Sequence, residues 1–265
     1  CHVSFGTAIG TVPAINGMGK PGGKLARRRV GRAAADSYVR FDGLLSGKQL
    51  DAAQKYLSSA TVQRSMGEAI LFDENPDASV PHTTEQRESS RGDERTTRIA
   101  WLERNSDDPA EPPLPGWIDR RLRLAARATH QELGEKLCPV GLDKANRWRP
   151  RYEPVQYAEY GVGAHYQNWH TDAELDSNDP EDARAITIVM LLRRANKGGK
   201  FQVRVNGKAS EVALQPGDAI GFPAKRLEHR VTRCQAGLRQ SIVCWVKHPI
   251  HKLQPKAAPR VKRAG

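Results

Sequence analysis

Short apolar segments separated by turn residues fill the chain from residue 150 onward, and this pattern constrains the fold more than any other feature. The segments lie at 155–157, 185–192, 201–205, 211–214, 219–222 and 240–246. Asn206-Gly207 separates two of them, and both residues tolerate the positive φ angles of a type I′ hairpin. Strands at such spacing favour an antiparallel sandwich or barrel. We predict an α+β, mainly β fold with a jelly-roll core over about 150–249.

The segment before this core has a different pattern. Apolar residues recur at helical spacing over 50–57 and over 117–137, which predicts amphipathic helices packed outside the sheets. Residues 73–98 are polar and interrupted by proline, so we expect a loop there. The folded domain is predicted to span 36–249.

The net charge of +12 comes from the two ends of the 265-residue chain. Residues 1–35 and 247–265 each carry six basic and no acidic residues, which leaves 30 basic and 30 acidic residues between them. We predict a flexible basic extension at 1–35 and a basic tail at 250–265. Nucleic-acid contacts would be limited to non-specific attraction by these ends.

The apolar runs and the cysteines bear on membrane association and on the cellular compartment. No apolar run approaches the roughly 18–20 residues that span a bilayer, so a soluble protein is expected, with no membrane partner. The four cysteines show no paired metal-ligand or disulfide spacing, which favours free thiols in a reducing, cytoplasmic compartment. The basic N-terminal region would also suit organelle targeting. The oligomeric state is not predicted.

His170-Thr171-Asp172 places two potential metal ligands at positions i and i+2, which point to the same side of an extended segment. His229 follows the apolar segment at 219–222. Two imidazoles and one carboxylate on one face of an octahedral ion leave three positions open, as in iron(II) oxygen chemistry. Arg239, ten residues beyond His229, could grip a carboxylate through two hydrogen bonds. This combination predicts a metal site with a bound keto acid.

Together these motifs resemble the prolyl 4-hydroxylase-like branch of the Fe(II)/2-oxoglutarate-dependent dioxygenases over residues 98–249. The resemblance rests on the segment from Tyr160 to Asp172, on Arg184-Ala185-Ile186-Thr187 with the turn Gly198-Gly199, and on Pro216-Gly217-Asp218 followed by His229, Gly237, Arg239 and Trp245. It implies a double-stranded β-helix (jelly-roll) core. It also implies that Tyr160 and Thr187 help Arg239 to bind the distal carboxylate of 2-oxoglutarate.

Three positions depart from the family pattern. Three residues separate Tyr166 from His170 where the family usually has two, and Lys200 replaces an acidic residue after the glycine turn. Arg239 stands where collagen-modifying members generally have lysine. Tyr166 and Trp169 suit either packing or a cavity wall, and Trp245 is predicted in the core.

The resemblance further implies the reaction. His170, Asp172 and His229 would bind Fe(II), and 2-oxoglutarate and O2 would be consumed, with ascorbate as an optional cofactor. The predicted activity is hydroxylation of a C–H bond, first of a prolyl residue in a peptide or protein, with succinate and CO2 released. The loop at 73–98 would close over the substrate. Alternatives are hydroxylation of a free amino acid or other small molecule, a cupin-like metal enzyme without a keto acid, and a non-catalytic β-barrel module that binds polyanions.

Overall fold

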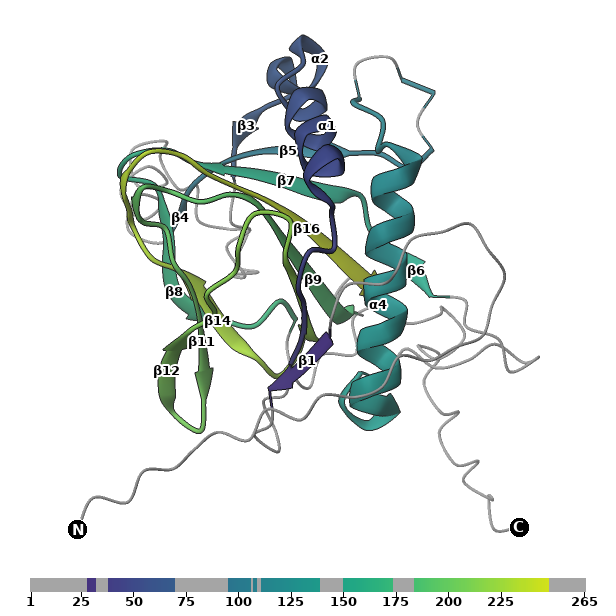
Figure 1. Cartoon of the computed structure of the whole chain (residues 1–265), viewed down its shortest axis with the longest axis vertical. Helices are drawn as coiled ribbons and strands as arrows, with labels where there is room; N and C mark the ends of the chain where they lie inside the picture. Colours follow the sequence, from purple (N-terminus) through teal and green to yellow (C-terminus); the bar gives the residue numbers. More distant parts are fainter. Residues whose placement is uncertain are drawn as a thin grey trace, which may run out of the picture.

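A computed structural model describes residues 28–31, 38–69, 95–105, 107–108, 111–138, 150–173 and 184–247. It has two antiparallel sheets and helices on one side (Figure 1). The nine-stranded large sheet has the order β1 (Arg28–Gly31), β2 (Tyr38–Phe41), β13 (Ala219–Pro223), β9 (Arg184–Arg193), β16 (Arg239–Lys247), β7 (Val155–Tyr160), β5 (Arg98–Leu102) and β3 (Gly67–Glu68), with β6 (Arg151–Tyr152) paired to β16. The small sheet has the order β12 (Lys208–Glu211), β11 (Phe201–Val205), β14 (Glu228–Val231), β8 (His165–His170) and β4 (Arg95–Thr96). A separate pair joins β10 (Lys197–Gly198) to β15 (Cys234–Ala236).

Strand β9 shows why the molecule has two hydrophobic cores. Ile186, Ile188 and Met190 alternate with residues of the opposite face and join the core beneath the helices. Val189 and Leu191 join the core between the sheets. A strand buried on both faces reads as a continuous apolar run, which explains the segment at 185–192.

In the part of the chain that the structure describes, three helices cover the outer face of the large sheet: α1 (Gly47–Leu57), α2 (Ala60–Arg64) and α4 (Gly116–Leu137). Figure 1 shows α4 running along this sheet, where it contacts β9, β2 and β13. The helix approaches the sheet closely at Gly221, since a Cβ atom there would lie 2.0 Å from Thr129 Oγ1. The glycine therefore lets the helix pack directly on the sheet.

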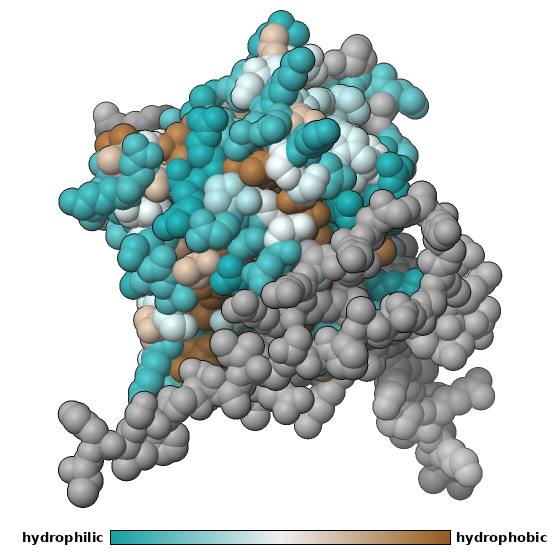
Figure 2. Space-filling model, in the orientation of Figure 1, coloured by the Kyte–Doolittle hydropathy of each residue, from teal (hydrophilic) through white to brown (hydrophobic). Residues whose placement is uncertain are grey.

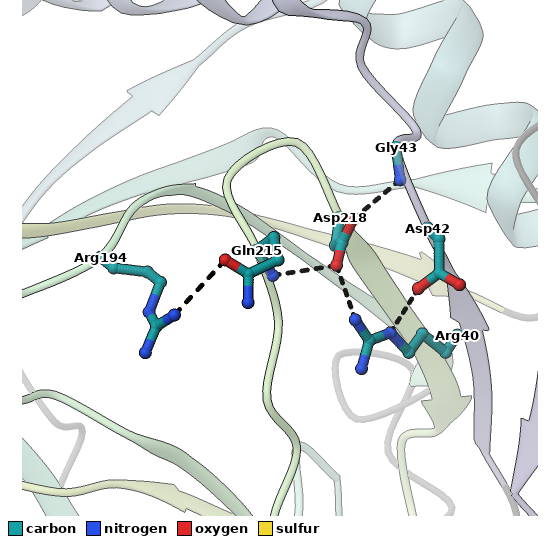
Figure 3. Close-up of polar contacts among 6 residues, drawn as sticks. All are labelled: Arg40, Asp42, Gly43, Arg194, Gln215 and Asp218. Atoms are coloured by element: carbon teal, nitrogen blue, oxygen red, sulfur yellow. Dashed lines mark hydrogen bonds and ion pairs between the residues drawn. The ribbon is translucent and has the colours of Figure 1, made fainter.

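Asp218 ties the N-terminal strand to the core, as Figure 3 shows. Its carboxylate accepts hydrogen bonds from Arg40 Nη2 at 2.8 Å and from the backbone N–H of Gly43 at 2.8 Å and of Gln215 at 2.9 Å. Arg40 Nε also donates to Asp42 at 2.6 Å. The Pro216-Gly217-Asp218 motif therefore holds β2 and the start of α1 against β13.

Most predicted elements are confirmed, including both helices and the hairpin at Asn206-Gly207, whose φ angles are 50° and 73°. The prediction at 211–214 was wrong, because β12 spans Lys208–Glu211 and pairs with β11 immediately after the tight turn. Arg28–Gly31, assigned to a flexible extension, form β1 paired to β2. Of the predicted loop at 73–98, Arg95–Thr96 form β4 and Arg98 begins β5; residues 73–94 and the tail at 250–265 lie outside the described residues.

The visible surface of the described residues is mostly hydrophilic, with small apolar areas between polar ones (Figure 2). None of the described helices combines the length and apolarity needed to cross a bilayer. Within the described residues Cys138, Cys234 and Cys244 are free thiols, as expected, and all three are buried.

Candidate metal and cosubstrate site

Adjacent strands of the small sheet bring the predicted metal ligands together. His170 ends β8 and pairs with His229 of β14, with ring centroids 4.3 Å apart. Asp172 lies two residues further, where its backbone N–H donates to the carbonyl of Ala224 at 2.9 Å. One ligand atom from each of the three residues lies within 4.8 Å of the other two.

A β-bulge aims His170 at this point. His229 pairs with His170 but Val231 pairs with Tyr166, so four residue steps on β8 match two on β14. Extra residues of this kind redirect side chains beside functional sites. The unusual spacing between Tyr166 and His170 noted in the sequence falls within this bulge. Their rings stack at a centroid distance of 3.8 Å.

Both imidazoles are held in the orientation a metal requires. Nδ1 of His170 lies 3.0 Å from the carbonyl oxygen of Asn168, and Nδ1 of His229 lies 3.0 Å from that of Leu227. Because a carbonyl only accepts, each Nδ1 carries the proton and each Nε2 presents its lone pair. Burial, together with the neighbouring His229, lowers the pKa of His170 and favours this neutral form. Such backbone bonds orient metal-binding histidines.

The carboxylate of Asp172 is the third ligand. Its Oδ2 atom lies 3.7 Å from His229 Nε2 and accepts a 2.5 Å hydrogen bond from Thr187 Oγ1. Burial alone would raise the pKa of Asp172, but the two histidines and the Thr187 hydroxyl outweigh burial and lower it. A carboxylate oxygen therefore faces two imidazoles, a donor set that fits a divalent iron ion.

Thr187 contacts a metal ligand. It is opposite Trp245 in the pairing of β9 with β16, six residues along the strand from Arg239. Its hydroxyl donates to the metal ligand Asp172. The predicted contact of Thr187 with the distal carboxylate of 2-oxoglutarate stays a prediction.

Arg239 occupies the other end of the site. Its side chain is buried, donates from Nη1 to Ser241 Oγ at 2.8 Å and lies over the Tyr160 ring at 5.0 Å. Tyr160 is its cross-strand partner on β7, so these two predicted residues are brought together. Burial lowers the pKa of the Arg239 guanidinium. No ion pair joins Arg239 to an acid among the described residues, so its charge faces the cavity without a counter-ion.

One cavity of about 240 Å³ connects the two ends. Its walls include the three candidate metal ligands, Tyr160, Arg239 and Ser241, together with Arg95, Trp101, Gln156, Arg184 and Trp245. The metal ligands and the guanidinium thus line the same cavity.

Two residues of the site were not predicted as functional. Glu153 accepts from Arg184 Nε at 2.7 Å and from Nη2 at 2.6 Å. Arg184 Nη1 also donates to the carbonyl of Asp172 at 3.2 Å, and its guanidinium lies 4.1 Å from the Trp245 ring. Trp245 is buried as predicted, but it also lines the cavity. The Arg-x-x-Thr motif pointed to Arg184, whereas Glu153 had no signal of its own.

Comparisons with known proteins agree with this geometry. Residues 155–247 match the family model described as the 2OG-Fe(II) oxygenase superfamily. A Pseudomonas putida prolyl 4-hydroxylase aligns with a TM-score of 0.55 at 16% identity, covering 80% of this chain and 92% of that chain. A prolyl hydroxylase from Trichoplax adhaerens, in complex with a hypoxia inducible factor peptide fragment, aligns at 0.53 and 14% identity, covering 82% and 84%. A viral collagen prolyl hydroxylase from Paramecium Bursaria Chlorella virus-1, in a 2OG complex, aligns at 0.50 and 17%, covering 80% and 96%. No curated protein sequence matches the chain.

Fold, donor set and family match together define the class: residues 155–247 carry the sequence pattern of an Fe(II)- and 2-oxoglutarate-dependent oxygenase. Within that class the fold is prolyl 4-hydroxylase-like, with a double-stranded β-helix core. The predicted resemblance and fold class are confirmed, as are the implied cofactors Fe(II), 2-oxoglutarate and O2.

Proposed function

We propose that this chain is an Fe(II)- and 2-oxoglutarate-dependent dioxygenase that hydroxylates a C–H bond of a prolyl residue in a peptide or protein. The observation that carries the proposal is the single cavity between two complementary groups of residues. At one end His170, Asp172 and His229 would hold the metal. At the other end the buried guanidinium of Arg239 would bind a carboxylate.

The residues at the two ends of the cavity would have different roles. The metal and cosubstrate would supply the oxidising chemistry, with succinate and CO2 as products. Arg239, oriented by Ser241 and Tyr160, would bind the distal carboxylate through charge-assisted hydrogen bonds. Burial of the Arg239 side chain between the sheets strengthens that interaction.

The prolyl substrate is supported by the fold neighbours and by the open side of the cavity. Three proteins of this fold are prolyl hydroxylases, and one of them holds a peptide. Trp101 is 40% exposed at the cavity wall and its ring centroid lies 6.0 Å from that of Trp245. Two indoles offer an apolar surface of the kind that an imino-acid ring packs on.

The first test is spectroscopic. Anaerobic protein with iron(II) and 2-oxoglutarate should develop the visible charge-transfer band of the chelate. His170→Ala should abolish the band and Arg239→Ala should raise the 2-oxoglutarate concentration needed for it. Arg194→Ala, an exposed arginine outside the metal cavity, serves as the control and should leave the band unchanged. A metal-loaded wild type without a band would contradict the proposal.

The second test addresses the substrate. Succinate formation should rise when prolyl peptides are added under air, and the peptide should gain the mass of one oxygen atom. Stimulation by free L-proline and by no peptide would instead support the small-molecule alternative.

A further inference from the structure

The charges lining the metal cavity are not all accounted for by metal and cosubstrate binding. Besides the ligands, the charged residues described along this cavity are Arg95, Arg184 and Arg239. Arg184 is held by both oxygens of Glu153, and Arg239 is the candidate partner of the cosubstrate. With a divalent metal and a dianionic cosubstrate in place, Arg239 faces the cosubstrate, and Arg184 is paired with Glu153, which Lys247 also contacts at 3.4 Å. Among the described arginines that line this cavity, Arg95 is the one left without such a partner.

Arg95 has a defined position beside the metal ligands. It lies on β4, opposite Tyr166 of β8, and its guanidinium carbon is 4.9 Å from the Tyr166 ring centroid. Tyr166 in turn stacks on His170 at 3.8 Å. The Arg95 guanidinium therefore contacts the Tyr166 ring, which contacts the metal-binding imidazole of His170. A group bound to Arg95 lies close to the reacting centre.

Within the described part of the chain, the hydrogen bonds of Arg95 supply no counter-ion for its charge. Nη2 donates to the neutral Gln156 side chain at 2.9 Å, and Nε is buried without a hydrogen-bond partner. No acidic side chain of the described residues forms an ion pair with it. A partly buried guanidinium costs free energy unless it is paired, and its fork geometry suits a carboxylate.

We propose that Arg95 binds a carboxylate of the primary substrate that lies near the carbon that is hydroxylated. An extended chain advances about 3.3–3.6 Å per residue, so in a peptide this carboxylate belongs to an acidic residue one or two positions from the target. The α-carboxylate of a free amino acid supplies the same chemistry. This inference rests on the proposed function and names the charge of its substrate.

The test uses protein loaded anaerobically with iron(II) and 2-oxoglutarate, so that substrates bind without turnover. One arm offers N-acetylated, C-amidated pentapeptides with a central proline, flanked by Asp, Asn, Glu, Gln, Lys or Ala. The other arm offers free L-amino acids mixed with their amides. Retained ligands are identified by mass spectrometry, and the acid-to-amide ratio is compared among variants. The arm that shows the preference identifies the source of the carboxylate.

The wild type should retain acids over matched amides by about tenfold or more, as expected for a charge-assisted bond. Arg95→Gln should reduce this ratio to about one, and Arg95→Glu should shift the peptide preference toward Lys. Arg98→Gln removes an exposed arginine three residues away, outside the metal cavity, and should keep the wild-type ratio.

A ratio near one in both arms, no retained ligand, or a preference that survives Arg95→Gln would overturn the inference. The charge-transfer band then separates the two proposals. If the band forms, the dioxygenase assignment stands and only the role of Arg95 fails. If the metal-loaded protein shows no band, both fail together.

Discussion

At the scale of single residues, the hydroxyl of Thr187 is committed to the carboxylate of Asp172. Thr187→Val keeps the shape of the side chain and removes this bond, so we expect metal affinity to fall about 10- to 100-fold, as for other outer partners of metal ligands. Thr187→Ser should restore most of it. Anaerobic titration with Fe(II) or Co(II) measures the change.

Ser241→Ala is the matched control for Thr187→Val, because it removes a hydroxyl at the opposite end of the cavity. It should weaken 2-oxoglutarate binding and leave metal affinity unchanged. Equal metal affinity in Thr187→Val and wild type, with both folded by circular dichroism, would show that Thr187 only fills space.

The site residues that could be predicted from the sequence were those whose relation is set by their spacing along the chain. His170 and Asp172 share one face of a short segment, and Arg239 follows His229 at a fixed distance along the chain. The hydrogen bond from Thr187 to Asp172 did not follow from the sequence, because it depends on the register between β9 and β16, which a motif does not contain. Arg95 was placed in a loop, and its unpaired charge emerges only when β4 is paired with β8.

At the scale of elements, the contact between α4 and β13 depends on one missing methyl group. Gly221→Ala would place a Cβ atom 2.0 Å from Thr129 Oγ1 and 2.8 Å from Ile188 Cδ1. Overpacking of this kind costs about 1–3 kcal/mol, so the urea midpoint should fall. Gly67→Ala, which meets nothing within 4 Å, should stay close to wild type. If Gly221→Ala had the urea midpoint of the wild type, α4 would be able to shift without a loss of stability.

Strand positions followed from the sequence where a segment was buried on both faces or bounded by a marked turn. β9 and β16 are nearly continuous apolar runs, and the β11–β12 hairpin is set by Asn206-Gly207. β8 escaped strand prediction because five of its six residues, from Tyr166 to His170, are only partly buried or exposed. Functional segments lose the apolar alternation that reveals ordinary strands, because their side chains serve a polar cavity.

At the scale of the whole molecule, the reactivity of the buried thiols measures how well the two cores exclude solvent. Cys138, Cys234 and Cys244 each have 0% exposure, and burial raises the pKa of Cys244 to about 11. A thiol with that pKa stays protonated at neutral pH and reacts poorly. In Cys1→Ser protein, a disulfide reagent should label none of the three within minutes, and all three after unfolding in guanidinium. Rapid labelling of the native variant would mean that the cores open readily.

The buried charge of Arg239 also has a consequence for the folded molecule as a whole. This charge is buried between the sheets, and a dicarboxylate that neutralises it stabilises the folded protein as well as entering a reaction. Ligand that binds only the native state adds about 2.7 kcal/mol of stability at a hundred times its Kd. Abundance of this protein would then follow the supply of its own cosubstrate, because protein starved of the acid unfolds and is degraded sooner.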